Sequence, residues 1–365
     1  MGLAVVRSLD APRRLATTQE MEDYEQELVD QYLLAAVGAG LGDSTVGGDR
    51  SVLFEFIAFL GRPVWTARPH DADRFLARQR KDLGRSRLTV QRKAWSLAHF
   101  FDFLLLRYQG DIHALTGCVV EQVIDEFNRP AQADYGVLRV PPSGEEVDQL
   151  FGPWRDWLPS ARKFLPAARD YLAASLWRRT GLRIAETYML DIRDWRRDLG
   201  EHGKIHVRFG KGSKGRGPKS RLAPAINSAG ALLDWWMAEV RHQFGDDWTD
   251  PDAPLLPSER RDEHTGFCRR VGDQALRDGL AFAVGEWLPD WSGRLSPHTL
   301  RHYCASSLYA RGMDLKAIQE LLGHSWLSTT TRYIHVQSDH IEHAWAVANE
   351  RTAARLGQQD HEGKW

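Results

Sequence analysis

Apolar residues recur at a spacing of three to four positions through most of the chain between residues 20 and 127. This period is typical of amphipathic helices, and it predicts helices over residues 20–38, 51–61, 71–84 and 88–108. Three of these segments end at a glycine, a residue that commonly terminates helices. The pattern predicts an all-helical domain over residues 20–127, preceded by an N-terminal tail over residues 1–19.

The helical period is lost over residues 128–142, which contain three prolines and few apolar positions. We interpret this stretch as a linker. Ser143 and Glu146 follow it with the spacing of a capping box, so a helix is expected to begin there. The second domain is therefore predicted over residues 143–350, with a C-terminal tail over residues 351–365.

The second domain is predicted to be mainly helical with one small antiparallel β-sheet. Alternating residues indicate a strand over 204–209, and a glycine- and lysine-rich turn leads to a returning strand over 220–226. Strands and helices do not alternate as in a Rossmann fold, which disfavours that class of enzyme. Helical periods occupy residues 144–154, 168–181, 229–244, 272–288, 298–312, 314–323 and 340–357.

The chain has 365 residues, 42% of them hydrophobic, and a formal net charge of −1, so its overall charge neither indicates nor excludes a polyanionic partner. Two stretches are locally basic: residues 62–93 have ten lysines and arginines against three acids, and residues 203–221 have seven and no acid. Either stretch is a solvated face or a surface that follows DNA phosphates. The candidate DNA-binding residues are Arg85, Arg87, Arg92, Lys93, Lys214, Arg216 and Lys219.

The three cysteines are odd in number, far apart and without C-x-x-C spacing, which argues against a disulfide framework and a thiolate zinc site. The apolar stretch at the N-terminus is too short for a signal peptide, and no later run is long enough to span a membrane. We therefore expect a cytoplasmic protein with no membrane partner.

The segment "SPHTLRH" combines features of a phosphate-binding site. Ser296 can cap a helix, and His298 and Arg301 then lie on one face of its first turns, beside N–H groups that attract anions. A histidine at such a position is also often a packed or surface residue. His298 and His302 have the spacing of a metal pair, but Thr299 replaces the glutamate of a zinc hydrolase motif, so no metal site is predicted.

A second arginine, Arg183, follows an apolar helix in "TGLRIAE", with Glu186 three positions later. Considered alone, Arg183 is interpreted as a solvated cation at a helix end. The planar fork of arginine can also bind two phosphate oxygens at once, so two arginines could clamp one phosphate. The segment "FGKGSKGRGPKSR" matches no nucleotide-binding loop, but a lysine in this hairpin could donate a proton to a leaving oxygen.

In "DLKAIQELLG", Asp314 is a plausible cap and Gly323 a plausible stop, which places His324 just beyond a helix. Tyr333 follows nine positions later, after three threonines that form helix reluctantly. Taken alone, Tyr333 is interpreted as a core aromatic.

Together these segments resemble the tyrosine recombinases, the phage-integrase family, over roughly residues 140–345. The resemblance rests on the order G-L-R-x-x-E, G-K-G-x-K, H-x-x-R and L-G-H, with a tyrosine nine residues after that histidine. It implies that Arg183 and Arg301 hold a phosphate and that Tyr333 is the nucleophile. It further implies catalytic roles for Lys211, His298 and His324 and a supporting role for Glu186. The family's hairpin pattern can also be aligned so that Arg216 takes the position of the lysine. Lys214 and Lys219 remain alternatives to Lys211.

The resemblance implies a site-specific recombinase or integrase that cuts and rejoins DNA through a 3′-phosphotyrosine, with no cofactor, ATP or metal. The implied partners are double-stranded DNA at specific sites, three further copies in a homo-tetramer and an accessory DNA-bending protein, with the protein at the nucleoid when DNA-bound. Alternatives are a resolvase, DNA relaxation of the type IB topoisomerase kind, or a non-catalytic DNA-binding regulator.

Overall fold

The computed structural model describes residues 14–130, 140–210 and 219–323. These residues form two compact units, one over residues 14–130 and the other over the described part of residues 140–323. Each unit has a hydrophobic core of its own.

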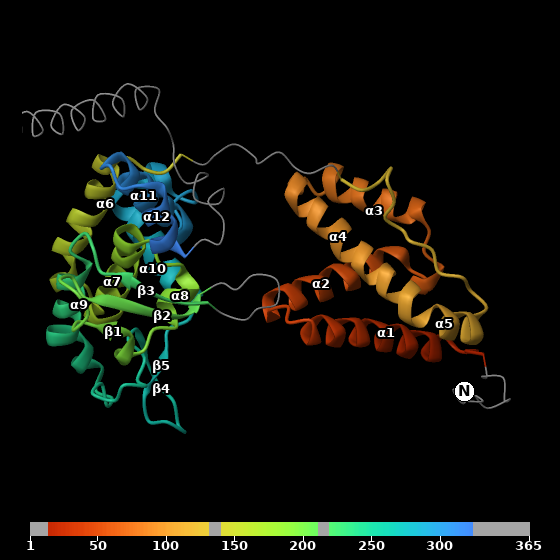
Figure 1. The fold of residues 1–365 in the computed structure, drawn as a ribbon, viewed down its shortest axis with the longest axis horizontal. Helices are drawn as coiled ribbons and strands as arrows, with labels where there is room; N and C mark the ends of the chain where they lie inside the picture. Colours follow the sequence, from red (N-terminus) through yellow and green to blue (C-terminus); the bar gives the residue numbers. More distant parts are fainter. Residues whose placement is uncertain (1–13, 131–139, 211–218, 324–365) are drawn as a thin grey trace, which may run out of the picture. The chain divides into compact units, whose positions relative to one another are not determined.

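The N-terminal unit is a bundle of helices (Figure 1). Its helices are α1 (Thr18–Gly38), α2 (Asp43–Leu60), α3 (Pro69–Lys81), α4 (Arg87–Phe103) and α5 (Gln109–Thr116), with a 3-10 turn at Val64–Thr66 and a π-helical turn at Leu104–Tyr108 between α4 and α5. The predicted helical periods are confirmed. Helix α2 begins eight residues before its predicted start at 51. The glycines in its first turns interrupt the apolar pattern, so the pattern does not indicate the earlier start. Gly48 leaves room for the Arg92 side chain of α4.

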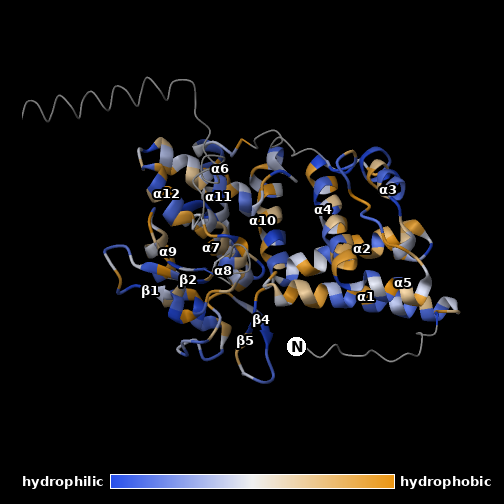
Figure 2. Cartoon of the chain, turned by 45° about the vertical axis from the view of Figure 1, so that its right-hand side comes forward, coloured by the Kyte–Doolittle hydropathy of each residue, from blue (hydrophilic) through white to orange (hydrophobic). Residues whose placement is uncertain are grey.

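Aromatic side chains fill the core of this unit. Phe56 of α2 meets Phe75 of α3 and Phe101 of α4 edge to face, and each of these three rings is at most 1% exposed. Edge-to-face packing is favourable because it places the positive rim of one ring on the negative face of another. Hydrophilic and hydrophobic residues alternate along the helices of this unit (Figure 2).

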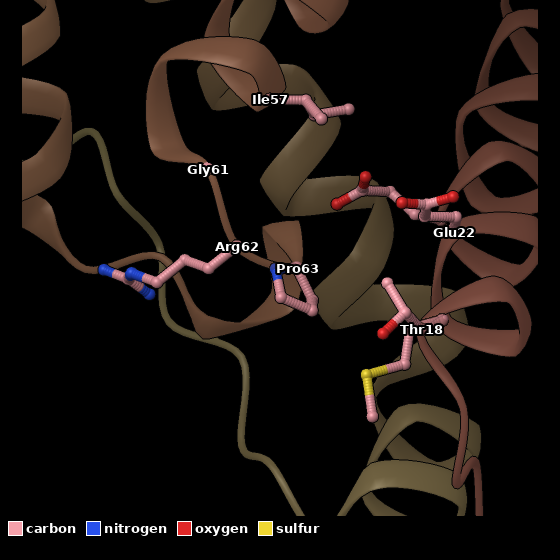
Figure 3. Close-up of a pocket in the computed structure, with 8 residues that line it drawn as sticks. Thr18, Glu22, Ile57, Gly61, Arg62 and Pro63 are labelled. Atoms are coloured by element: carbon pink, nitrogen blue, oxygen red, sulfur yellow. The ribbon is translucent and has the colours of Figure 1, made fainter.

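A pocket of about 470 Å³ lies in the N-terminal unit between the start of α1 and the end of α2 (Figure 3). No candidate catalytic residue lines it. Its lining residues are Thr18, Met21, Glu22, Glu25, Ile57, Gly61, Arg62 and Pro63.

The second unit surrounds the buried helix α7 (Phe164–Thr180), which packs against α9, α10 and α11 (Figure 1). Its other helices are α6 (Gly144–Trp157), α8 (Ile184–Tyr188), α9 (Ala229–Trp235), α10 (Asp273–Trp287), α11 (Pro297–Ala310) and α12 (Leu315–Leu322). Short 3-10 turns occupy Leu158–Ser160, Ile192–Asp194, Arg241–Phe244 and Pro289–Trp291, and a π-helical turn, Trp236–Val240, continues α9.

The predicted hairpin forms an antiparallel sheet in the order β1 (Trp195–Arg196), β2 (Lys204–Gly210), β3 (Lys219–Pro224). Its register places Ile205 opposite Ala223 and Val207 opposite Arg221. A further sheet pairs β4 (Pro257–Arg261) with β5 (Cys268–Arg270), so the described residues contain two small sheets where the sequence pattern predicts one. These two strands are short and rich in arginine, so they lack the apolar alternation that identifies a strand.

Helix ends in the second unit follow the predicted capping chemistry. Ser143 and Glu146 form the capping box of α6, and the Ser296 hydroxyl caps α11 by accepting from the Thr299 N–H. Asp314 caps α12, and Gly323 ends it in the left-handed conformation, with φ of 65°. Among the described residues, no helix has both the length and the apolar content that crossing a membrane requires.

Candidate active site

The first site element is the sharp connection between α7 and α8. Gly181 ends α7 with φ of 68°, and a side chain there would overlap Leu322. Arg183 then caps α8: its backbone N–H donates to Glu186 Oε2 at 2.9 Å, and its Nη1 donates to Oε1 at 2.7 Å. The sequence "GLRIAE" therefore fixes the arginine and the glutamate against each other within one turn.

Glu186 is buried, with 2% of its surface exposed, and it lies among three arginines. Arg221 of β3 binds it with both ends of the guanidinium: Nη1 donates to Oε1 at 2.9 Å and Nη2 to Oε2 at 2.8 Å. Burial by itself raises the pKa of Glu186, but the hydrogen bonds and charges of Arg221 and the charge of Arg183 outweigh it and lower that pKa to about 2. Glu186 is therefore ionised at neutral pH.

Arg301 lies one turn into α11 and is completely buried. Its Nη1 is 3.9 Å from Glu186 Oε2 and also donates to the Gly181 carbonyl, while Nη2 donates to the Leu322 carbonyl at 2.7 Å. Arg301 thus joins the end of α7 to the end of α12.

The three arginines share a second set of acceptors besides Glu186, the last carbonyls of α12. Arg221 Nε donates to the Leu321 carbonyl at 3.1 Å, and Arg183 Nη1 lies 3.5 Å from the Leu322 carbonyl that Arg301 also binds. Carbonyls at a helix C-terminus have no partner within the helix and carry partial negative charge, so cations stabilise them. The structure therefore brings together Arg183, Glu186 and Arg301, as the sequence motifs suggest, around one carboxylate and one helix end.

His298 is exposed in the first turn of α11, three residues before Arg301. Its ring meets that of His302 edge to face, with centroids 4.7 Å apart. Within residues 14–130, 140–210 and 219–323, no group of three or more histidine, cysteine, aspartate or glutamate side chains is placed to hold a metal ion.

Five candidate residues lie outside the described residues: Lys211, Lys214, Arg216, His324 and Tyr333. Two described glycines lie next to them in the sequence. Gly210, the last residue of β2, precedes Lys211, and Gly323, the cap of α12, precedes His324.

The candidate DNA-binding residues differ in their exposure. Arg85, Arg87, Arg92 and Lys219 are exposed. Lys93 is only 9% exposed, and its ammonium donates to Glu55 and, at 2.9 Å, to Gln79. A contact with a phosphate needs an accessible cation, so the structure removes Lys93 from the candidate set.

Arg221 is the site residue that sequence analysis did not single out. In the sequence it is distinguished only as one charge of the basic stretch 203–221. The strand pattern does carry a signal. Arg221 lies two positions before the buried Ala223, on the same face of β3, whereas the intervening Leu222 is 48% exposed. A charged residue at a buried position of a strand implies a buried partner.

The model of the phage integrase family matches residues 158–340. The tyrosine recombinase XerC of Thermodesulfovibrio yellowstonii is 32% identical over 266 residues, which cover 71% of this chain and 74% of the relative. The chain belongs to the phage integrase family. XerC of Herpetosiphon aurantiacus is 28% identical over 322 residues, which cover 86% of this chain and 92% of that protein. This membership confirms the resemblance drawn from the motifs and makes the chain a tyrosine-type DNA recombinase.

Solved structures show the same fold. The Tn1549 transposon integrase in complex with a circular intermediate DNA is similar with a TM-score of 0.62 and 18% identity, over 88% of this chain and 99% of that one. The XerH site-specific recombinase bound to a palindromic difH substrate has a TM-score of 0.60 and 18% identity, over 92% of this chain and 86% of that one.

Proposed function

We propose that this phage integrase family member is a site-specific recombinase that cuts and rejoins double-stranded DNA through a transient 3′-phosphotyrosine at Tyr333, without ATP or metal. The observation that carries the proposal is the convergence of Arg183, Arg221 and Arg301 on Glu186 and on the end of α12. His324 is the second residue after that helix, and Tyr333 follows nine positions later.

The charge of the cluster suits a phosphodiester. Three guanidinium groups face one carboxylate, which leaves an excess of two positive charges in a largely buried setting. Charges in such a setting are screened less than at the surface and stabilise an anion strongly. The Arg183 side chain is 23% exposed and can meet a phosphate directly. Arg301 is completely buried, so a direct contact with DNA requires the groups around it to move.

The proposed chemical step is a transesterification. The Tyr333 oxygen attacks the phosphorus and loses its proton to a neighbouring base, for which His298 and His324 are the candidates. The bond from phosphorus to the 5′ oxygen breaks, and that oxygen takes a proton from Lys211. A tyrosine with a pKa near 10 needs such assistance, because it is protonated at neutral pH. A second 5′-hydroxyl reverses the step, which conserves the phosphodiester bond.

We assign DNA binding to both predicted domains. Residues 20–127 form the core-binding domain in this proposal, with the exposed Arg85, Arg87 and Arg92 along the phosphates. Residues 143–350 form the catalytic domain, joined by the linker over residues 128–142, and Lys219 adds a cation beside the site. Strand exchange between two duplexes requires a homo-tetramer, as the family resemblance implies.

Covalent trapping tests the proposal. The wild-type chain and Tyr333→Phe are incubated with fluorescent nicked duplexes, selected from a randomised library by binding to the wild-type chain. We expect wild-type protein to form an adduct that survives denaturing electrophoresis. Tyr333→Phe is expected to bind the same duplex without forming one. An adduct on Tyr333→Phe, or none on wild-type protein, contradicts the proposal.

A further inference from the structure

Arg221 occupies a central position in the cluster. Its side chain is 14% exposed, and all three guanidinium nitrogens are used: two bind Glu186, and the third donates to the Leu321 carbonyl. It therefore connects β3, α8 and the end of α12. Bidentate bonds to a carboxylate fix the guanidinium in one plane, which a single contact would not do.

The backbone approaches this side chain at two points, tightly at Gly323 and at ordinary contact distance at Gly210. A Cβ on Gly323 would lie 3.0 Å from Arg221 Cδ and Nη1, and a Cβ on Gly210 would lie 3.4 Å from Nη1. The first contact is tighter than ordinary packing, so a side chain at residue 323 would push Arg221 a few tenths of an ångström out of its place. Gly210 and Gly323 directly precede Lys211 and His324, so both catalytic candidates continue from backbone that rests against Arg221.

We propose that Arg221 is a positioning residue for the recombination reaction: it orients Glu186 toward Arg183 and Arg301 and sets where the chain leaves β2 toward Lys211 and α12 toward His324. This inference rests on the proposed function. Arg221 need not touch the DNA, because it acts through the groups that it holds.

The chain offers a matched control in Arg241. Its Nη1 and Nη2 donate to Asp246 at 2.5 and 3.0 Å, and its Nε donates to the Pro254 carbonyl at 3.0 Å. This is the same pattern of two bonds to one carboxylate and one to a carbonyl, made with residues outside the Glu186 cluster. Lysine at either position keeps the charge and loses the bidentate geometry.

The test compares Arg221→Lys with Arg241→Lys in the full chain, below the unfolding temperature of both. The probe is the nicked fluorescent duplex selected on the wild-type protein. We expect Arg221→Lys to bind it with unchanged affinity and to form the covalent adduct about 10²-fold more slowly, the cost of displacing reacting groups by roughly 1 Å. Arg241→Lys is expected to lose thermal stability and to keep the adduct rate. If Arg241→Lys does not fold, Arg208→Lys replaces it, since Arg208 Nε donates to both carboxylate oxygens of Asp194, the last residue of the 3-10 turn before β1, at 2.8 and 3.1 Å.

A pH profile supplies a readout that a purely structural role would not move. Weaker bonding to residue 221 raises the pKa of Glu186 from its depressed value, so the carboxyl takes up a proton at higher pH. The adduct rate of Arg221→Lys should therefore begin to fall at a higher pH than that of wild-type protein. Equal rates and equal pH profiles in Arg221→Lys and the control overturn the inference. If wild-type protein forms no adduct, the proposed function fails, and the inference fails with it.

Discussion

Glycines at two helix ends permit the close packing around the arginine cluster, and replacing them by alanine tests that packing. Gly181 and Gly323 have φ of 68° and 65° and lie against Leu322 and Arg221. Gly293 lies in the same unit with φ of 71°, and a Cβ there would meet nothing within 4 Å. The three positions share a backbone conformation and differ in the space around them.

The expected losses follow from these surroundings. All three alanine variants carry the cost of a left-handed residue, about 1–2 kcal/mol, and Gly293→Ala carries only that. In Gly181→Ala the new methyl overlaps Leu322 and lies 3.5 Å from Cys304 Sγ. Overpacking adds about 1–3 kcal/mol, so its total loss is about 2–5 kcal/mol. Gly323→Ala should fall between the two, because the Arg221 side chain is held by Glu186 but retains some freedom to shift.

Urea unfolding measures these losses through tryptophan fluorescence, since most of the 14 tryptophans lie in the second unit. The midpoints of the three variants are compared at an unchanged denaturant slope, so that a shift reports stability alone. The expected order of stability is Gly293→Ala, then Gly323→Ala, then Gly181→Ala. Equal losses in all three would refute the close packing of Gly181 on α12 and of Arg221 on Gly323.

Two further predictions concern the charges. The folded pKa of Glu186 is about 2 against an ordinary 4.5, so its contribution to stability is complete above pH 4.5 and is lost as the pH falls toward 2. Wild-type protein should lose about 3 kcal/mol more than Glu186→Gln between pH 5 and pH 2, and parallel curves would contradict this. In the N-terminal unit, Arg92→Gln should reduce the slope of log affinity against log salt by about 1, because Arg92 is exposed. Lys93→Met should lower thermal stability and leave that slope unchanged, because Lys93 is bonded to Glu55 and Gln79; a reduced slope for Lys93→Met would show that this lysine does contact DNA.

The helices were predictable because their signals are local. The apolar period identified the long helices, and the caps at Ser143, Ser296 and Asp314 each depend on residues within one turn. Strands β4 and β5 were not predictable, because they are only five and three residues long and their residues alternate in neither size nor polarity. The early start of α2 was not predictable either, because Gly47 and Gly48 interrupt its apolar pattern, and Gly48 makes room for the Arg92 side chain rather than favouring a helix.

Within the candidate site, the motifs led to Arg183, Glu186 and Arg301, and the structure gathers these three. They did not lead to Arg221, because its partners are 35 and 100 positions away in the sequence. Nor could the sequence show which of the candidate cations are exposed. Lys93 and Arg92 are neighbours in one basic helix, and only the packing of α4 against α2 and α3 decides which of them is buried.

The central claim is that Tyr333 forms the covalent bond to DNA, and peptide mapping of the trapped adduct tests it most directly. The wild-type adduct is digested with protease and nuclease, and the peptide that carries the residual nucleotide phosphate is sequenced by mass spectrometry. The account predicts a single modified peptide with the phosphate on Tyr333. A nucleotide phosphate on any other residue would contradict it.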